Sequence, residues 1–149
     1  MIRCLPIGIC SWNYQLEGDG HWAKVGYDWG ERGEIIVDGT RLWIEKLGIM
    51  NSSWWLKSGD RDVAVARKTS IFSRTFEGSG PAGEFRLVAH SGFGRTMLLT
   101  MPGTSGAVIS PDHAFTRRAT ITGDVSDFTT LCFGFWLTGL MWRRAARRR

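Results

Sequence analysis

The feature that most constrains this chain is its last apolar stretch, which runs from Phe128 to Trp142 without a charged residue. Plotted at 100° per residue, its apolar side chains fall on every side of a helix rather than along one stripe. A helix of that kind lies either at the centre of a folded protein or inside a bilayer. The stretch therefore predicts a central core element or a membrane anchor.

Length and flanking charge separate these two possibilities. Fifteen residues rise about 22 Å as a helix, against the ~30 Å of hydrocarbon that a spanning helix crosses. A spanning helix would also have to carry either the arginines that follow it or a whole folded domain across the membrane. We therefore expect a buried central helix over residues 126–144 and a basic tail over 145–149. A transmembrane tail anchor is the alternative.

The residues before this stretch are typical of a helix start. Asp124 and Asp127 can accept hydrogen bonds from the unpaired N–H groups of the first turn, and their charges suit the positive end of the helix dipole. Capping accounts for both acids more simply than a calcium site, which needs six or more oxygen ligands.

Residues 12–123 alternate between short strands and turn signals every eight to twelve residues, a pattern typical of a sandwich or barrel. Asp38-Gly39 is a favoured hairpin turn because both residues can take positive φ. Phe85, Leu87 and Ala89 fall on one face of an alternating segment. The expected strands include 12–16, 22–29, 34–37, 40–47, 53–57 and 62–68, and residues 1–11 are expected to form a lead-in strand or loop.

These elements predict one domain over residues 1–149 that is mainly β. Its expected architecture is an antiparallel β-meander closed into a barrel around a central hydrophobic C-terminal α-helix. The 19 glycines and the eight tryptophans and eight phenylalanines suit turns and strands in an all-β design. A strongly curved sheet of about ten or more strands also needs something large inside it.

A short repeat runs through the middle of the meander. The segment 70–75 (SIFSRT) recurs at 91–96 (SGFGRT) and 113–118 (HAFTRR), and a fainter copy lies at 48–53 (GIMNSS). Each period holds two strands, so the unit is predicted to be a hairpin with its Phe-x-Arg element always at the same end. Arg74, Arg95 and Arg117 could line one rim of the barrel as an anion-binding row. The other interpretation is that each phenylalanine plugs the barrel end while its arginine covers the rim and stacks on neighbours.

The net charge of +5 is concentrated at the C-terminus. Five arginines lie there, and without them the chain has 14 basic and 14 acidic residues. The neutral body makes nucleic acid an unlikely partner. The candidate lipid- or anion-binding residues are therefore the terminal arginines, Arg143, Arg144, Arg147, Arg148 and Arg149.

No metal site, cofactor or catalytic constellation is predicted. The cysteines Cys4, Cys10 and Cys132 lack metal-ligand spacing, and their odd number indicates a reducing compartment. The histidines lie far apart. The segment 78–83 matches G-x-G-x-x-G but precedes a strand-like segment rather than a helix, so we interpret it as a hairpin loop.

A β-meander followed by one hydrophobic C-terminal helix resembles the tubby-like C-terminal superfamily, which includes the phospholipid scramblases and the plant LURP-one-related proteins. The resemblance covers residues 12–144. It rests on segments 33–39 and 67–74, on 128–142 closed by Arg143-Arg144, and most of all on the order of elements. It implies a barrel of about twelve strands around the helix and association with membrane lipid, through phosphoinositide binding or a scramblase-like role. The acidic calcium-binding segment and proline-rich N-terminus of scramblases are not matched.

We therefore expect a non-enzymatic, cytoplasmic monomer that associates reversibly with anionic membrane lipid surfaces and is peripheral on the membrane. Each Lys or Arg near an anionic leaflet contributes about 1 kcal/mol to such adsorption. The alternative is a protein-interaction or scaffold module with no lipid role, in which the arginines only keep the helix exit solvated.

Overall fold

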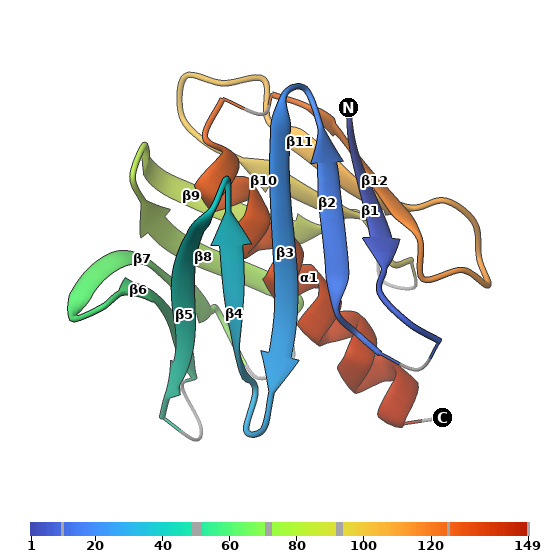
Figure 1. The fold of residues 1–149 in the computed structure, drawn as a ribbon, viewed down its shortest axis with the longest axis horizontal. Helices are drawn as coiled ribbons and strands as arrows, with labels where there is room; N and C mark the ends of the chain where they lie inside the picture. Colours follow the sequence, from blue (N-terminus) through green and yellow to red (C-terminus); the bar gives the residue numbers. More distant parts are fainter. Residues whose placement is uncertain (10, 49–51, 71–72, 92–93, 125, 149) are drawn as a thin grey trace.

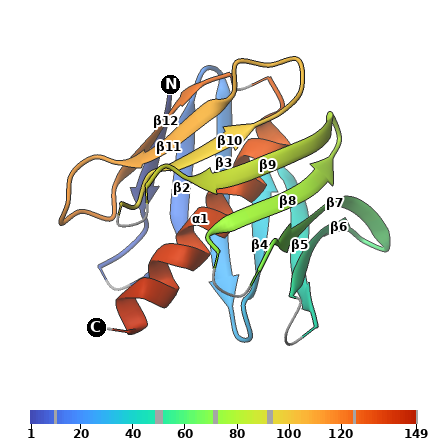
Figure 2. The same cartoon turned by 180° about the vertical axis from the view of Figure 1, so that it is seen from behind.

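The fold is a closed barrel of twelve antiparallel strands with one helix inside it, as predicted (Figure 1). The computed structural model describes residues 1–9, 11–48, 52–70, 73–91, 94–124 and 126–148. Each strand pairs with the next along the chain, and β1 pairs with β12 to close the barrel. The view from behind shows the helix running obliquely across the barrel, with the two chain termini at opposite ends (Figure 2).

The elements have the following bounds: β1 (Ile2–Pro6), β2 (Tyr14–Gly18), β3 (His21–Asp28), β4 (Arg32–Val37), β5 (Thr40–Leu47), β6 (Ser53–Ser58), β7 (Arg61–Lys68), β8 (Thr75–Gly80), β9 (Gly83–Ala89), β10 (Met97–Thr100), β11 (Ala107–Pro111), β12 (Ala119–Gly123) and α1 (Phe128–Arg147). The lead-in segment is thus a strand of the barrel. The predicted strand over 12–16 is wrong at its start, because β2 begins only at Tyr14. The segment 78–83 forms a hairpin between β8 and β9, as predicted.

The strands alternate between core and outer surface. In β9, Phe85 and Leu87 are buried while Glu84 and Arg86 are exposed. Successive side chains of a strand point to opposite faces, so one face of each strand supplies the core and the other meets solvent. This period of two is the pattern from which the strands were predicted.

The helix α1 fills the barrel. Every residue from Thr130 to Trp142 is buried. Asp127 caps its start, since the Asp127 Oδ1 accepts a hydrogen bond of 3.2 Å from the Thr130 N–H. Within the described ranges, no helix is long and apolar enough to cross a membrane.

The predicted end of the helix is wrong. Residues 145–149 were expected to form a tail beyond a helix over 126–144, yet α1 continues to Arg147. Alanine and arginine are strong helix formers, so Ala145 and Ala146 extend the helix past the barrel. Arg143, Arg144 and Arg147 are therefore helical residues.

Two glycines let the helix approach the barrel wall. A Cβ on Gly139 would lie 2.0 Å from the Tyr27 hydroxyl, which donates a 2.6 Å hydrogen bond to the Trp136 carbonyl. A Cβ on Gly33 would lie 2.6 Å from the Trp136 Nε1, which donates to the Gly26 carbonyl over 2.9 Å. These contacts fix α1 against β3 and β4.

The antiparallel order places alternate loops at opposite ends of the barrel (Figure 1). We call the end where α1 leaves the barrel the C-terminal rim. It is formed by the loops β1–β2, β3–β4, β5–β6, β7–β8, β9–β10 and β11–β12. The end where α1 begins is the N-terminal rim.

Candidate functional site

Four loops of the C-terminal rim share one construction. Each is closed by a backbone hydrogen bond from an N–H to the carbonyl six residues later. The four pairs are Ile7 to Asn13 (2.8 Å), Thr69 to Thr75 (3.0 Å), His90 to Thr96 (2.9 Å) and Asp112 to Arg118 (2.9 Å). Three of these loops contain the sequence repeat. The repeat thus lies at the same end of the barrel each time, as predicted.

The fourth loop, residues 7–13, was missed by the sequence reasoning. Its counterpart of the repeat arginine is Trp12, so the residue types gave no signal. Strand spacing was the only available clue, since this loop also joins two strands at the same end of the barrel. In the fainter copy, the Ser52 hydroxyl donates to the Gly48 carbonyl over 3.4 Å, and residues 49–51 lie outside the described ranges.

Each repeat arginine is bonded to the next loop around the rim. Arg74 donates to the carbonyls of Ser91 and Gly94, the latter over 2.7 Å. Arg95 donates to the carbonyls of His113 (2.9 Å) and Thr116 (3.1 Å). In both cases the two acceptors lie three residues apart, so the guanidinium bridges the two ends of a turn.

Arg117 completes this series by joining the last loop to the first. It donates to the carbonyls of Gly8, Ile9 and Ser11, on the opposite side of the seam where β12 meets β1. All of these acceptors are neutral dipoles. The three arginines therefore hold the loops together while keeping their full positive charges.

The predicted stacking is confirmed for Arg95 and Arg117, and the predicted phenylalanine plug is wrong for the one repeat phenylalanine that is described. Arg95 lies over the Trp142 ring at 5.6 Å and Arg117 over the Trp12 ring at 6.0 Å. Phe115, however, is 98% exposed at its loop tip. Phe72 and Phe93 lie outside the described residues. The barrel end is instead filled by Trp142, whose Nε1 donates to the Arg95 carbonyl over 2.9 Å.

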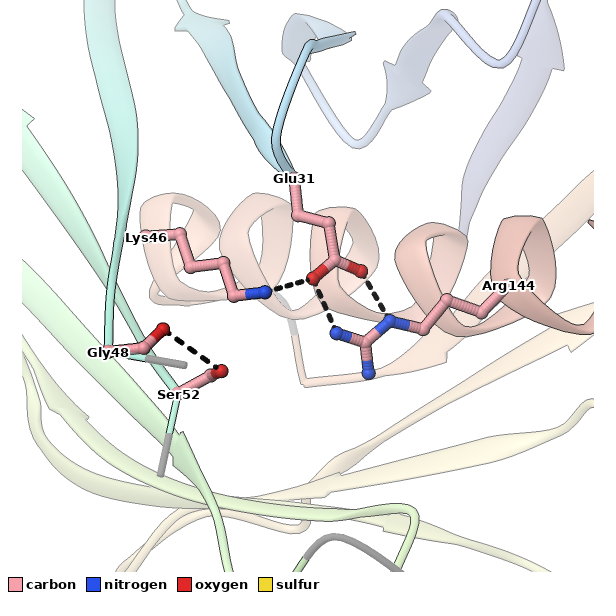
Figure 3. A network of polar contacts seen from close by, with 5 residues as sticks. All are labelled: Glu31, Lys46, Gly48, Ser52 and Arg144. Carbon is pink, nitrogen blue, oxygen red and sulfur yellow. Dashed lines mark hydrogen bonds and ion pairs between the residues drawn. The ribbon is translucent and has the colours of Figure 1, made fainter. Parts of the chain in front are cut away.

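One terminal arginine is neutralised by an acid in the β3–β4 loop (Figure 3). Arg144 donates to both carboxylate oxygens of Glu31, with 2.5 Å from Nη2 to Oε1, and the Lys46 Nζ lies 2.6 Å from the same Oε1. Burial works to raise the pKa of Glu31, but the hydrogen bonds and charges of Arg144 and Lys46 lower it to about 2. This network ties the end of α1 to the barrel wall.

The other terminal arginines have different surroundings. Arg143 lies over the Tyr27 ring at 5.5 Å. Arg147 and Arg148 are exposed. Arg149 lies outside the described residues. The predicted group of five therefore does not act as one uniform tail.

We call the loops that carry Arg74, Arg95 and Arg117 the arginine loops. A cavity of about 410 Å³ lies between them and the end of α1. Its basic lining residues are Lys68, Arg74, Arg95, Arg117, Arg144 and Arg148, and no carboxylate is found among the described residues that line it. Burial and then the charges of Arg144 and Arg148 lower the pKa of Lys68. The fold thus brings the predicted arginine row together with two of the predicted terminal arginines, and adds Lys68.

Exposed apolar side chains lie at the tips of the same rim. Ile9 in the β1–β2 loop, Trp29 in the β3–β4 loop and Phe115 in the β11–β12 loop are 92%, 94% and 98% exposed. Single exposed apolar residues are common on protein surfaces. These three lie on separate loops of the rim that also holds the basic cavity.

The N-terminal rim has the opposite charge. Its loops carry Asp19, Asp38, Asp60, Asp124 and Asp127. The N-terminal ammonium pairs with Asp19 at 2.7 Å, and the His21 Nδ1 lies 2.8 Å from the Asp38 carboxylate. The molecule is therefore polarised along the barrel axis, with its basic end where α1 leaves.

A larger groove of about 1000 Å³ lies on the outer wall of β6–β10. Its central row is Arg67, Glu77 and Arg86, which are direct cross-strand neighbours, and Glu84 lies beside them. Two cations and two carboxylates cancel, so this groove has no preference for ligand charge.

Metal and thiol chemistry find little support in the described part of the chain. No group of three His, Cys, Asp or Glu side chains there could hold a metal ion. Cys4 and Cys132 are buried free thiols, and burial raises the pKa of both. Cys10 lies outside the described residues.

Fold and site together define a class: a closed antiparallel barrel around its own C-terminal helix, with a basic and partly apolar rim. Comparison with known proteins found no matching family model, no matching curated protein and no matching solved structure. The resemblance to the tubby-like superfamily therefore stays a prediction.

Proposed function

We propose that this protein is non-enzymatic and associates reversibly with anionic membrane surfaces through its C-terminal rim. The observation that carries the proposal is the nearly complete exposure of Ile9, Trp29 and Phe115 on the rim that also holds the basic cavity. Aromatic and aliphatic loop tips can enter the interfacial layer of a bilayer while neighbouring cations meet the headgroups.

The two kinds of contact are each weak and combine well. A cation near an anionic leaflet contributes about 1 kcal/mol, and an apolar side chain that leaves water contributes about 1.5–3 kcal/mol when fully buried. One such signal gives only marginal adsorption, whereas two together give stable but reversible attachment. Arg147 and Arg148, on the exposed end of α1, add to the electrostatic part.

Charge polarity supports one docking orientation. The aspartates of the N-terminal rim would be repelled by an anionic leaflet, while the cations of the C-terminal rim would be attracted. Electrostatic steering of this kind raises the rate of productive encounters and disfavours the inverted approach.

The resemblance to the tubby-like superfamily adds finer proposals. The bound lipid would be a phosphoinositide, or the protein would have a scramblase-like role, on the cytoplasmic side of a membrane. The alternative, a protein-interaction module with no lipid role, predicts instead that the exposed loop tips contact another protein.

Vesicle flotation tests the proposal. Vesicles of phosphatidylcholine with phosphatidylserine should float the wild-type protein at low salt and release it at high salt, and pure phosphatidylcholine should float little of it. The double variant Ile9→Ser/Trp29→Ser should bind at least about tenfold more weakly, since it removes two exposed apolar contacts. Trp43→Ser/Val108→Ser is the matched control, because both residues are partly exposed on the barrel wall.

Failure of the wild-type protein to float at low salt would contradict the proposal, as would equal loss in the rim and wall variants. A stoichiometric protein partner that is lost with Ile9→Ser/Trp29→Ser, without vesicle binding, would favour the interaction module.

A further inference from the structure

We infer that the cavity between α1 and the arginine loops is a binding pocket for a phosphate monoester that carries an apolar group. The inference deepens the proposed membrane association, on whose rim it rests, by naming the chemistry of the ligand. The monoester could be a lipid headgroup or a soluble molecule, and the test below separates these sources.

Apart from Arg144, the pocket's charges are not neutralised by a carboxylate of the described residues. Among the described residues, Arg74, Arg95 and Arg117 donate only to carbonyls, which do not cancel a positive charge. A guanidinium has five N–H donors. Their bonds to described residues number two on Arg74 and three each on Arg95 and Arg117, so each guanidinium has donors that no described residue accepts from.

Like charges crowd in the cavity. Lys68 shares it with Arg144 and Arg148; burial first, and then the charges of these two arginines, lower the pKa of Lys68, while the charge of Glu31 raises it. Among the described residues of the chain, Arg144 alone of these three cations has a carboxylate partner, Glu31. Such crowding costs stability when the site is empty, and a bound anion relieves it. The arrangement is the one expected of an anion site rather than of a cluster that stabilises the fold by itself.

The charge of the pocket favours one form of anion. A phosphate monoester carries a charge of about −1.5 to −2 and three acceptor oxygens, whereas a carboxylate or a phosphodiester carries a single charge. Lys68, Arg74, Arg95, Arg117 and Arg148 leave five cations around the cavity once Arg144 is paired with Glu31. That charge suits the more highly charged group, and guanidinium forks match phosphate oxygens in geometry.

The size and lining of the cavity suit a ligand that is larger than phosphate. A volume of about 410 Å³ exceeds what a bare phosphate fills, and lies within the usual range of small-molecule pockets. Met97, Phe115, Met141 and Trp142 also line the cavity. An apolar substituent on the phosphate would therefore lie against them.

The test compares two soluble ligands by calorimetric titration of the full chain. Hexyl phosphate, a monoester, should bind saturably, and dibutyl phosphate, a diester of similar apolarity, should bind at least about tenfold more weakly. The variant Lys68→Gln/Arg148→Gln should weaken hexyl phosphate binding at least about tenfold. Both positions lie outside the arginine-to-carbonyl bonds that join the loops, so the fold should be retained.

The matched control is Arg3→Gln/Arg61→Gln, which removes the same charge from exposed positions outside the pocket. It should leave hexyl phosphate binding unchanged. A thermal melt gives an independent measurement: without ligand, Lys68→Gln/Arg148→Gln should melt no lower than wild type, because the substitutions remove repulsion. Absence of saturable hexyl phosphate binding, equal binding of the diester, or equal loss in the control variant would overturn the inference.

Vesicles containing phosphatidic acid, a lipid phosphate monoester, or phosphatidylserine at equal surface charge separate the two proposals. Stronger flotation with phosphatidic acid supports both and identifies a lipid source. Hexyl phosphate binding without flotation on either vesicle supports the pocket with a soluble source and contradicts membrane association. Equal flotation on both vesicles without hexyl phosphate binding supports membrane association and contradicts the pocket.

Discussion

Arginine side chains at the C-terminal rim fall into two groups according to what accepts their hydrogen bonds. Arg144 donates to the Glu31 carboxylate, so its charge is cancelled locally. Arg74, Arg95 and Arg117 donate to carbonyls and keep their charge. The ion pair with Glu31 attaches the helix to the barrel wall. The arginines bonded to carbonyls supply the positive charge that the proposed anionic ligand would bind.

Glu31 should make the stability of the protein depend on acid pH. Its folded-state pKa of about 2 lies below the ordinary carboxyl value, so its contribution is present above about pH 4.5 and is lost as pH falls toward 2. Glu31→Gln should lower the free energy of unfolding by about 2 kcal/mol at pH 7, after allowance for solvent screening. Urea unfolding of both proteins from pH 7 to pH 3 measures the difference.

The difference between wild type and Glu31→Gln should shrink steadily below pH 4.5. Glu45→Gln serves as the control, because Glu45 lies one residue from Lys46 on the same strand without entering the network. A difference that stays constant down to pH 3 would show that the network contributes no pH-dependent stability.

Residue types alone predicted part of this site. The repeat placed Arg74, Arg95 and Arg117 on one rim, because residues at equal spacing in equal hairpins return to the same end of a barrel. The repeat could not reveal the fourth loop, since Trp12 stands there in place of the repeat arginine and the loop is recognised only by its closing backbone bond between Ile7 and Asn13. It could not reveal the Glu31–Arg144 pair either, which joins residues 113 positions apart.

At the scale of elements, α1 was predicted in kind and place but not in length. Its apolar residues on all sides left a core helix or a membrane anchor, and its length and the arginines that follow favoured the core helix. The helix continues beyond Trp142 because neither Gly nor Pro interrupts the alanines and arginines that follow. Pairing of neighbouring strands likewise followed from short turns, whereas pairing of β1 with β12 required the closed structure.

Packing of α1 against β3 should depend on one of its two glycines far more than on the other. Gly139→Ala would place a methyl group 2.0 Å from the Tyr27 hydroxyl, and should lower the free energy of unfolding by about 2–3 kcal/mol. A methyl group on Gly134 would meet only Leu99 side-chain atoms, at 3.4 Å or more. Gly134→Ala should be near neutral, because the helix propensity of alanine, about 1 kcal/mol better than that of glycine, offsets this mild crowding. Denaturant unfolding of both variants tests this.

Tyr27→Phe identifies the cause. In the wild-type background, Tyr27→Phe should lower stability, because it removes the hydrogen bond to the Trp136 carbonyl. In the Gly139→Ala background it also removes the clashing oxygen, so it should recover part of the lost stability. Equal effects of Gly134→Ala and Gly139→Ala would contradict the packing described for α1.

At the scale of the whole molecule, the barrel separates charge as well as enclosing a core. The meander topology sends alternate loops to opposite ends of the barrel. The C-terminal rim carries the basic residues and the N-terminal rim carries the aspartates, so charge is separated along the barrel axis. Net charge and composition could not predict this polarity, because the body of the chain is neutral. It emerges only when loops distant in sequence meet at a rim.

Quenching of tryptophan fluorescence by brominated lipid tests the central claim, that the C-terminal rim meets the membrane. Vesicles of brominated phosphatidylcholine with phosphatidylserine should quench the wild-type protein, and Trp29→Phe should lose most of that quenching while still binding, since phenylalanine keeps the apolar contact. Trp43→Phe, on the barrel wall, should be quenched like wild type. Unchanged quenching in Trp29→Phe, with loss in Trp43→Phe, would contradict the account.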